Sequence, residues 1–533
     1  MSWEPGQRVV VLERDPSTGD RKRILWMDPE IEFLRAHLLF LEDHGYEVEK
    51  ASSESAGLSL LRRQRFDLVL LDEQISGKES VAGALQEIRE SHPRVPVLLV
   101  TKNDEERLVE AAWGRSFDGW LPKPVNPTQA LAVCISALRT RSAASHQSTS
   151  NYVRDISEIK SNLLANPSPS KWEKIYFQLC KWDVELHFAT SSSLESMHRD
   201  QKRELARRFL SYVENNYIAW AGRQGGNPDL HTFTVRRKVI PMLRKHGKCV
   251  LFVMAGLRFG QWLYVQKLIE SRFKVENNAA WALLPTDKAF CRAALFSGRM
   301  PRDINRDQPQ LWQRLREEED AAPYERELLK IQLRKEGLDL EDPRFIHVRT
   351  QEDAANLASN LARHEDARLI VVEVEFIDLL DVHRRDHPLD PAPREKEVRA
   401  RAGEWFQSSG LMQAFEVMAE NKRPVVVTSD HGTVRVDTPA EVFCQEEKTP
   451  NPRVKIGPNI SCDERQALFV ESPSQYGLPG EAGEIAYAIA KENFYFVYPN
   501  KFQYFVTQFK DQMVSGGLSM EEMIVPLSTL TPL

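Results

Sequence analysis

Apolar and polar positions between residues 23 and 140 alternate in five strand-then-helix units. The apolar runs of this segment are RILWMD, YEVEKA, DLVLLDE, PVLLVTK and DGWLPKP. Segments with a helical spacing of apolar positions, such as AGLSLLRRQ and VAGALQEIRES, lie between them. Because strands that alternate with helices pair in parallel, the pattern predicts an α/β domain over residues 22–140, with a parallel sheet covered on both faces.

The rest of the chain divides into a helical region and a second α/β region. Residues 1–21 are an N-terminal extension, residues 141–151 a polar linker, and residues 152–234 a predicted helical bundle. One face of a helix in this bundle is formed by Trp172, Ile175, Leu179, Trp182 and Leu186. From residue 235 to 533, the runs CVLFVMAGL, RLIVVEVEFIDLL and RPVVVTSDHG predict the buried strands of a larger α/β domain.

Composition and charge limit the classes of protein to which the chain can belong. Its 533 residues are 42% hydrophobic and 28% charged, which is typical of a globular protein with several domains. The formal net charge of -6 does not favour nucleic-acid binding, and we expect no direct DNA-binding domain. The six cysteines are scattered, and we find neither a membrane-spanning apolar run nor a signal-peptide layout. These features predict a cytoplasmic protein without membrane insertion.

Polar residues lie at the carboxyl ends of predicted strands in the N-terminal domain. They are Asp28, Asp72, Thr101 and, after the fifth strand, Lys123. Because the carboxyl ends of parallel strands meet at one edge of a sheet, we expect these side chains to share a pocket. Two carboxylates can hold Mg²⁺, which neutralises an incoming phosphoryl group. In such a pocket Asp72 can attack phosphorus, while Thr101 and Lys123 bind phosphoryl oxygens.

This pocket resembles the phosphorylation site of two-component receiver domains, which have a flavodoxin-like fold. The resemblance implies that Asp72 is the phosphoacceptor and that Asp28 and Asp72 bind Mg²⁺. It implies switch or phosphate-binding roles for Thr101, Lys123 and Trp120. It also implies a sensor histidine kinase as partner and a homodimer that forms on phosphorylation.

One position departs from the receiver pattern. Receivers usually have two adjacent acids after the first strand, whereas here Asp28 is followed by Pro29, which cannot ligate a metal. Glu30 is the nearest other acid. The departure leaves open a phosphorylation-independent scaffold as a further hypothesis.

The stretch PVVVTSDHGT places Asp430 and His431 at the end of a predicted strand. A carboxylate beside an imidazole suits zinc, although a turn capped by Asp430 would have the same residues. Asp378 ends another predicted strand, in VVEVEFIDLL. With FSGRMPRDI and SGGLSMEEMIVP, these blocks resemble the PglZ form of the alkaline-phosphatase superfamily. The order of the three domains resembles the PorX-type response regulators of type IX secretion, which implies a zinc-dependent phosphodiesterase-type site with a threonine nucleophile.

The chain holds only part of this family's metal site. The residues that remain are Asp378, Asp430 and His431. Other residues stand at the matching positions of further ligands and of the nucleophile: Ala255 in MAGLR, Lys288 in LPTDKAFCR, Val382 after FIDLL, and Ile456 in KIGPNI. The resemblance implies Zn²⁺, but a site with half of its ligands should lose at least one metal ion. The neighbouring Thr286 and His383 could replace the nucleophile and one histidine ligand, but not the ligands missing at Ala255 and Ile456.

Two functions of different classes remain. In the first, a signalling protein accepts phosphate at Asp72, and its PglZ-like domain is a pseudoenzyme that binds a downstream protein or ligand. In the second, the receiver regulates a zinc-dependent phosphodiesterase or phosphatase that acts on oligonucleotides or phosphoesters. We favour the first hypothesis because several positions of one site have changed together. The sequence identifies neither the kinase nor the downstream partner.

Overall fold

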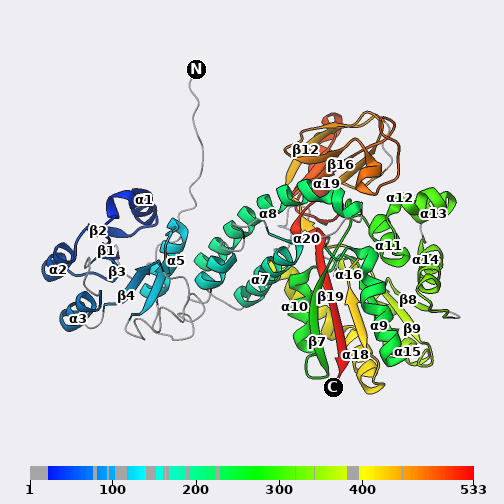
Figure 1. Cartoon of the computed structure of the whole chain (residues 1–533), viewed down its shortest axis with the longest axis horizontal. Coiled ribbons are helices and arrows are strands. Elements are labelled where there is room, and N and C mark those ends of the chain that lie inside the picture. The colour runs from blue at the N-terminus through cyan, green and yellow to red at the C-terminus, as the bar shows by residue number, and fades with distance from the viewer. Residues whose placement is uncertain are drawn as a thin grey trace. The chain divides into compact units, whose positions relative to one another are not determined.

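The structure is a computed structural model that describes most of the chain. The described residues are 22–75, 81–92, 95–102, 117–139, 152–159, 163, 167–187, 192–222, 228–318, 320–340, 343–380, 395–445 and 449–533. They belong to two compact units, one within residues 1–166 and 190–200 and the other within residues 167–189 and 201–533. Figure 1 labels the helices and strands of each unit.

The N-terminal unit contains a five-stranded parallel sheet in the order β2-β1-β3-β4-β5. Its strands are β1 (Arg23–Met27), β2 (Glu47–Ala51), β3 (Leu68–Asp72), β4 (Val97–Thr101) and β5 (Gly119–Pro122). Its helices are α1 (Arg35–Asp43), α2 (Glu54–Arg63), α3 (Val81–Ser91) and α5 (Pro127–Arg139). The five predicted strands are therefore present at the predicted positions.

Successive residues of each strand pack on opposite faces of this sheet, as the pleat requires. Leu25, Val69 and Leu99 lie in a core formed with α2 and α3. Ile24 and Leu70 lie in a second core, formed with α1 and α5. Helices cover both faces of the parallel sheet, which confirms the predicted fold class.

Two long helices follow, α7 (Pro169–His187) and α8 (Ser192–Ala221). The predicted apolar face of α7 is buried along its length. Its Trp172 ring lies edge-on to Phe209 of α8, with 5.3 Å between ring centroids. Phe209 in turn lies 5.6 Å from the ring of Trp281, whose indole nitrogen donates a hydrogen bond of 2.9 Å to Glu173. The aromatic side chains of α7 and α8 therefore share a core with the C-terminal sheet, to which Trp281 belongs.

The C-terminal unit is built on a six-stranded sheet in the order β7-β19-β10-β6-β9-β8. Its strands are β6 (Cys249–Met254), β7 (Phe273–Trp281), β8 (Arg344–Val348), β9 (Leu369–Val374), β10 (Val425–Thr428) and β19 (Ile524–Pro532). Strands β8, β9, β6 and β10 are parallel, and β19 runs antiparallel between β10 and β7. The parallel strands present their carboxyl ends at one edge, where a site is expected.

Helices surround this sheet, and the smaller sheets are separate from it (Figure 1). The helices are α9 (Ile240–His246), α10 (Phe259–Val265), α11 (Lys288–Ser297), α12 (Pro301–Asp307), α13 (Pro309–Glu317), α14 (Ala322–Lys335), α15 (Gln351–Ala362), α16 (Phe376–Leu379), α17 (Glu395–Ser408), α18 (Leu411–Glu420), α19 (Phe502–Phe509) and α20 (Met520–Met523). The short strands are β11 (Val434–Arg435), β12 (Thr438–Phe443), β13 (Val454–Gly457), β14 (Ser461–Cys462), β15 (Ala467–Val470), β16 (Ala486–Ala490), β17 (Phe494–Val497) and β18 (Met513–Val514). The apolar pattern of the sequence did not predict these short strands.

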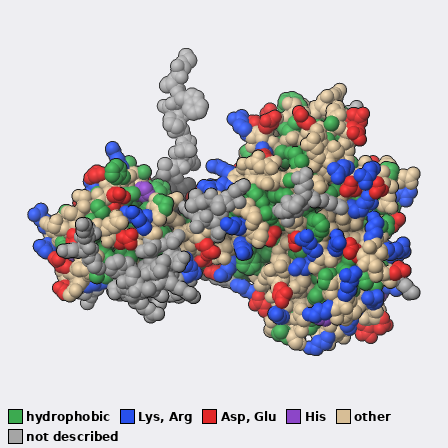
Figure 2. Space-filling view, in the orientation of Figure 1, with side chains coloured by type: hydrophobic (Ala, Val, Ile, Leu, Met, Phe, Trp, Pro, Cys, Tyr) green, Lys and Arg blue, Asp and Glu red, His purple; other side chains and the backbone are tan. Residues whose placement is uncertain are grey.

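Charged side chains of both signs are interspersed on the face of the C-terminal unit shown in Figure 2. No extended area of one sign covers the described residues on that face. Among the helices that the structure describes, none combines the length and the apolar character needed to cross a bilayer.

Candidate functional sites

The sheet of the N-terminal unit brings Asp28, Asp72 and Lys123 together at the carboxyl ends of its strands. The Nζ atom of Lys123 lies 2.7 Å from Oδ2 of Asp72 and 3.2 Å from Oδ2 of Asp28. Both carboxylates are fully buried. Their other oxygens accept backbone hydrogen bonds, from the N–H of Glu30 at 2.7 Å and from that of Gln74 at 2.9 Å. These contacts hold both Oδ2 atoms towards one point.

The charges of this pocket favour an additional cation. Burial, together with the neighbouring charge of Asp28, raises the pKa of Asp72 despite the hydrogen bonds from Lys123 and Gln74. Burial lowers the pKa of Lys123, but the hydrogen bonds and charges of Asp72 and Asp28 outweigh it, and the net shift is upward. Two carboxylates against one ammonium leave an excess negative charge. Asp28 and Asp72 therefore fit the Mg²⁺ that receiver chemistry requires, and bound Mg²⁺ would neutralise phosphoryl oxygens.

Thr101 lies at the end of β4, the strand next to β3, and is fully buried. Its hydroxyl donates a hydrogen bond to the carboxylate of Glu73, which follows the expected phosphoacceptor. The other oxygen of Glu73 accepts a hydrogen bond of 3.0 Å from the backbone N–H of Lys102. Trp120, on β5, packs in the core beneath α2 and α3. In this arrangement Glu73 holds the hydroxyl that phosphate binding would use.

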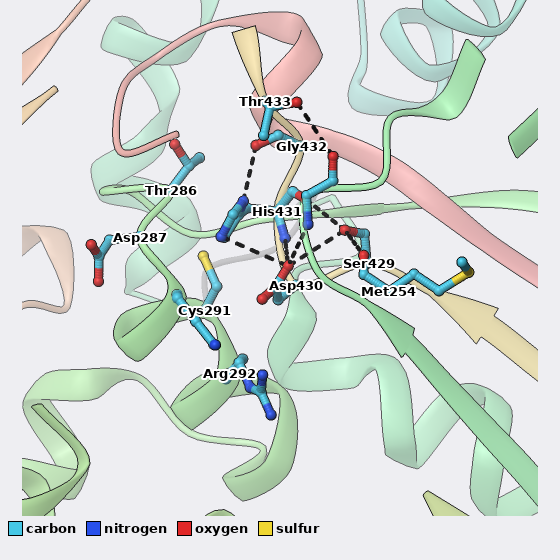
Figure 3. Close-up of polar contacts among 12 residues, drawn as sticks. Met254, Thr286, Asp287, Cys291, Arg292, Ser429, Asp430, His431, Gly432 and Thr433 are labelled. Carbon is cyan, nitrogen blue, oxygen red and sulfur yellow. Dashed lines mark hydrogen bonds and ion pairs between the residues drawn. The ribbon is translucent and has the colours of Figure 1, made fainter. Parts of the chain in front are cut away.

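In the C-terminal unit, Asp430 and His431 follow the buried strand β10, as the sequence predicts. Oδ1 of Asp430 accepts hydrogen bonds from the backbone N–H of His431 at 2.8 Å and of Gly256 at 3.2 Å. Figure 3 shows the imidazole of His431 beside this carboxylate, with Nδ1 at 2.9 Å from the carbonyl oxygen of Gly432. Gly432 is required here, because a Cβ atom would lie 1.8 Å from the backbone oxygen of Glu521.

The positions at which the PglZ resemblance implies a lost ligand or nucleophile differ in their surroundings. Ala255 follows β6 and is buried, and Ile456 is buried in β13. Lys288 begins α11, and its Nζ atom pairs with Oε1 of Glu375 at 2.6 Å. Val382 and the neighbouring His383 lie outside the described residues. The structure thus shows the surroundings of three of these four positions.

The prediction that Asp378 ends a strand was wrong. Strand β9 ends at Val374, and the chain then turns into α16, in which Leu379 donates a backbone hydrogen bond to Glu375. Asp378 lies in this short helix with an exposed side chain. The apolar residues of EFIDLL form a helical turn. The sequence did not predict this turn, because it directly follows the apolar run of the strand.

A buried ion cluster that sequence reasoning missed lies beside the residual site. Arg292, on α11, pairs with Oε1 of Glu325 at 2.8 Å, with Glu373, and with Glu375 at 3.6 Å. Burial raises the pKa of Glu325 to about 8, whereas for Glu373 the charge of Arg292 and a hydrogen bond from His347 outweigh burial and lower the pKa. Two signals in the sequence could have revealed this cluster. Lys288 and Arg292 are four residues apart on one helix face, and VVEVEF carries two glutamates on one side of an apolar strand.

Burial and nearby positive charges have opposite effects on the pKa of Asp430. Burial raises the pKa of Asp430, but the charges of His431, Arg292 and Lys288 outweigh it, and the net shift is downward. Close by, burial lowers the pKa of His231 to about 4, although the charge of Asp430 opposes the shift. Figure 3 shows Cys291 projecting from α11 on the side of Asp430. The charges of His431, Arg292 and Lys288 thus favour the ionised form of the buried Asp430 carboxyl.

The residues that the structure describes around Asp430 do not fit a pair of zinc ions. Oδ2 of Asp430 is buried without a hydrogen bond, and the contact of His431 Nδ1 with Gly432 leaves Nε2 as a possible ligand atom. Within the described parts of the chain, however, no group of three His, Cys, Asp or Glu side chains is arranged to hold a metal. The hydroxyl of Thr286 is also engaged, because it donates to Gly517 at 2.8 Å and accepts from Gly516 at 3.1 Å.

Three successive regions of the chain match known protein families. Residues 24–134 match the response regulator receiver domain, and residues 142–221 match the PorX response regulator linker domain. Residues 234–530 match the BREX system PglZ alkaline phosphatase-like domain. The protein is thus a response regulator with an alkaline-phosphatase-like domain. The chain belongs to the PglZ family, and its three domains occur in the order of a PorX-type response regulator.

Curated relatives match the receiver region. The alginate biosynthesis transcriptional regulatory protein AlgB of Pseudomonas aeruginosa is 35% identical over 120 residues, which are 22% of this chain and 26% of that protein. The transcriptional regulatory protein ZraR of Escherichia coli is 34% identical over 110 residues, or 20% of this chain and 24% of that protein. The chain thus spans about a quarter of the length of these relatives.

Solved receiver structures match the same region. A CheY-like receiver protein from Methanospirillum hungatei is 27% identical and has a TM-score of 0.21, with 22% of this chain and 94% of that chain covered. The receiver domain of NtrX from Brucella abortus is 25% identical and also has a TM-score of 0.21, with 22% and 98% covered.

Proposed function

We propose that the protein is a cytoplasmic response regulator that is phosphorylated on Asp72 and whose PglZ domain binds a partner or ligand without turnover. The receiver would take its phosphoryl group from a sensor histidine kinase, and phosphorylation would favour a homodimer. The downstream partner is a protein or ligand that contacts the PglZ domain. A link to type IX secretion rests on the PorX-type domain order.

The ion pair between Lys288 and Glu375 carries the proposal that the output domain does not hydrolyse phosphoesters. A hydroxyl nucleophile is expected at the position of Lys288, and a protonated amine cannot form the phosphoenzyme that a hydroxyl would form. Ala255 and Ile456 supply no ligand atoms for a second metal. A displacement at phosphorus then lacks both the nucleophile and the two-metal clamp on attacking and leaving oxygens.

An activity assay on the full-length protein tests this part of the proposal. A chromogenic phosphodiester and a short oligonucleotide are supplied with Zn²⁺ or Mn²⁺, and Asp430→Ala is measured beside the wild type. We expect the two proteins to show the same background rate. Turnover by the wild type that disappears in Asp430→Ala would instead support the metal-dependent phosphodiesterase hypothesis.

Phosphorylation is tested separately with acetyl phosphate and Mg²⁺. We expect phosphate-affinity electrophoresis to retard the wild type but not Asp72→Asn. Asp43→Asn, at an exposed position of α1, is the matched control and should be retarded like the wild type. If the wild type is never retarded at any Mg²⁺ concentration, the protein is better described as a phosphorylation-independent scaffold.

A further inference from the structure

A polar cavity lies at the far end of α11 from Lys288. Its volume is about 350 Å³. The lining comes from η2 (His231–Phe233), η3 (Val235–Val239), α12 and the carboxyl ends of α11 and α14. Helix α11 runs from Lys288 to Ser297, which separates the cavity from Lys288, at the expected nucleophile position, by roughly 14 Å along the helix axis. The cavity is therefore distinct from the residual metal site.

Cations outnumber carboxylates in and around this cavity. The lining cations are Arg236, Arg299, Arg306 and Lys335, and the lining carboxylates are Asp303 and Glu336. Glu336 pairs with Arg236 at 3.2 Å, and Asp303 pairs with Arg306 at 3.4 Å. Asp307, just outside the lining, pairs with both Arg299 and Arg306. The exposed ammonium group of Lys335 forms no ion pair or hydrogen bond within the described residues, so its charge is available to an anionic ligand.

A buried hydrogen-bond acceptor lines the same cavity. Gln332 is only 5% exposed, and its Oε1 atom has no hydrogen-bond partner within the described residues. The amide lies close to Gly298, where a Cβ atom would be only 2.5 Å from Nε2 of Gln332. Gly298 has a φ of +66°, a conformation that glycine adopts without strain. An unpaired buried carbonyl is costly, and a ligand that donates a hydrogen bond to it removes this cost.

We propose that this cavity binds a small phosphate ester that also carries a hydrogen-bond donor. The phosphate would contact Lys335 and the exposed guanidinium of Arg306, and the donor would bind Oε1 of Gln332. The partly buried ring of Phe233 supplies an apolar wall. The volume suits a ligand the size of a sugar phosphate or a mononucleotide. This ligand site goes beyond the proposed function and does not depend on whether the metal site is active.

Calorimetric titration of the full-length protein tests the proposal. The probes are ribose 5-phosphate, adenosine 5′-monophosphate, adenosine, inorganic phosphate and succinate. We expect at least one phosphate ester to bind with a Kd below about 1 mM, and adenosine and succinate to bind at least tenfold more weakly. The proposal is overturned if neither ester binds in this range, or if adenosine or succinate binds as tightly as the esters.

Single variants locate the binding. Lys335→Ala should weaken ester binding about tenfold, because a charge-assisted contact is lost. The control is Arg334→Ala, which removes a charge from the adjacent exposed position of α14 outside the lining and should leave the Kd unchanged. Gln332→Met, checked for an unchanged melting temperature, should weaken the binding of the esters more than the binding of inorganic phosphate. Equal effects of Lys335→Ala and Arg334→Ala would place the ligand elsewhere.

Discussion

The ammonium group of Lys288 lies 2.6 Å from the carboxylate of Glu375, at the position where the PglZ resemblance implies a nucleophile. Glu375 also faces Arg292, whose buried guanidinium pairs with Glu325 and Glu373. Lys288 and Arg292 thus lie beside the glutamates at the carboxyl end of β9. Because these cations offset part of the negative charge of the carboxylates, we expect the site to bind a divalent metal more weakly. This expectation agrees with the proposed loss of phosphodiesterase activity.

The two cations should differ in their contribution to stability. Arg292→Met should lower the free energy of unfolding of the C-terminal unit by about 3–5 kcal/mol, because it removes the cation that pairs with the buried carboxylates of Glu325 and Glu373. Lys288→Met is the matched control. The Lys288 side chain is half exposed, and its loss should cost less than about 1 kcal/mol. Urea unfolding followed by tryptophan fluorescence measures both, and an Arg292→Met effect as small as that of Lys288→Met would contradict this account.

The stability of the receiver should depend on pH through Asp72. Its raised pKa means that the folded state binds this proton more tightly than the unfolded chain. The contribution to stability is present below the ordinary pKa of about 3.9 and is lost as the pH rises through the raised pKa. Lys123, also raised, loses its contribution only in the alkaline range. At neutral pH, Asp72→Asn should therefore melt at a higher temperature than the wild type.

Differential scanning calorimetry from pH 4 to pH 8 measures this effect. The difference between Asp72→Asn and the wild type should shrink as the pH falls. The exposed substitution Asp43→Asn should stay within about 0.5 kcal/mol of the wild type throughout. A lower melting temperature for Asp72→Asn at neutral pH would show that the ion pair with Lys123 outweighs the burial of the carboxylate.

The hydrogen bond between Thr101 and Glu73 should oppose the phosphorylated state. Glu73→Ala removes this acceptor, which competes with a phosphoryl oxygen for the hydroxyl, so the phosphorylated protein should persist several-fold longer. Thr101→Val should have the opposite effect. Decay of the retarded band in phosphate-affinity electrophoresis measures both half-lives. An unchanged half-life in Glu73→Ala would mean that this hydrogen bond does not compete with phosphate.

Restoring an acid after Asp28 should strengthen Mg²⁺ binding. Pro29→Asp adds a carboxylate beside the two that already face Lys123, and a hard divalent cation gains a charged oxygen ligand. We expect a severalfold lower Kd for Mg²⁺, measured by the fluorescence of Trp26 and Trp120. Pro29→Ala is the control for loss of the proline itself. If Pro29→Asp binds Mg²⁺ no more tightly than Pro29→Ala, the second acid comes from elsewhere, with Glu30 as the first candidate.

The local sequence pattern predicted helices and strands better than it predicted the ion pairs between them. The run VAGALQEIRES corresponds to α3, and the five receiver strands appear where the apolar runs lie. The short strands within residues 434–514 were missed, because strands of two to six residues with mixed composition leave no clear period. The cluster of Arg292, Glu325 and Glu373 joins three segments that are distant in the sequence. Spacing marks the charged positions of α11 and of VVEVEF, but it does not show that these positions pair with each other.

Zinc content tests the central claim most directly. The full-length protein is loaded with Zn²⁺, dialysed against metal-free buffer and measured by elemental analysis, with Asp430→Ala treated in parallel. The residual ligands Asp430 and His431 are too few for a stable pair of ions, so we expect less than one zinc ion per chain to remain. Two zinc ions per chain that disappear in Asp430→Ala would contradict the account and restore the phosphodiesterase hypothesis.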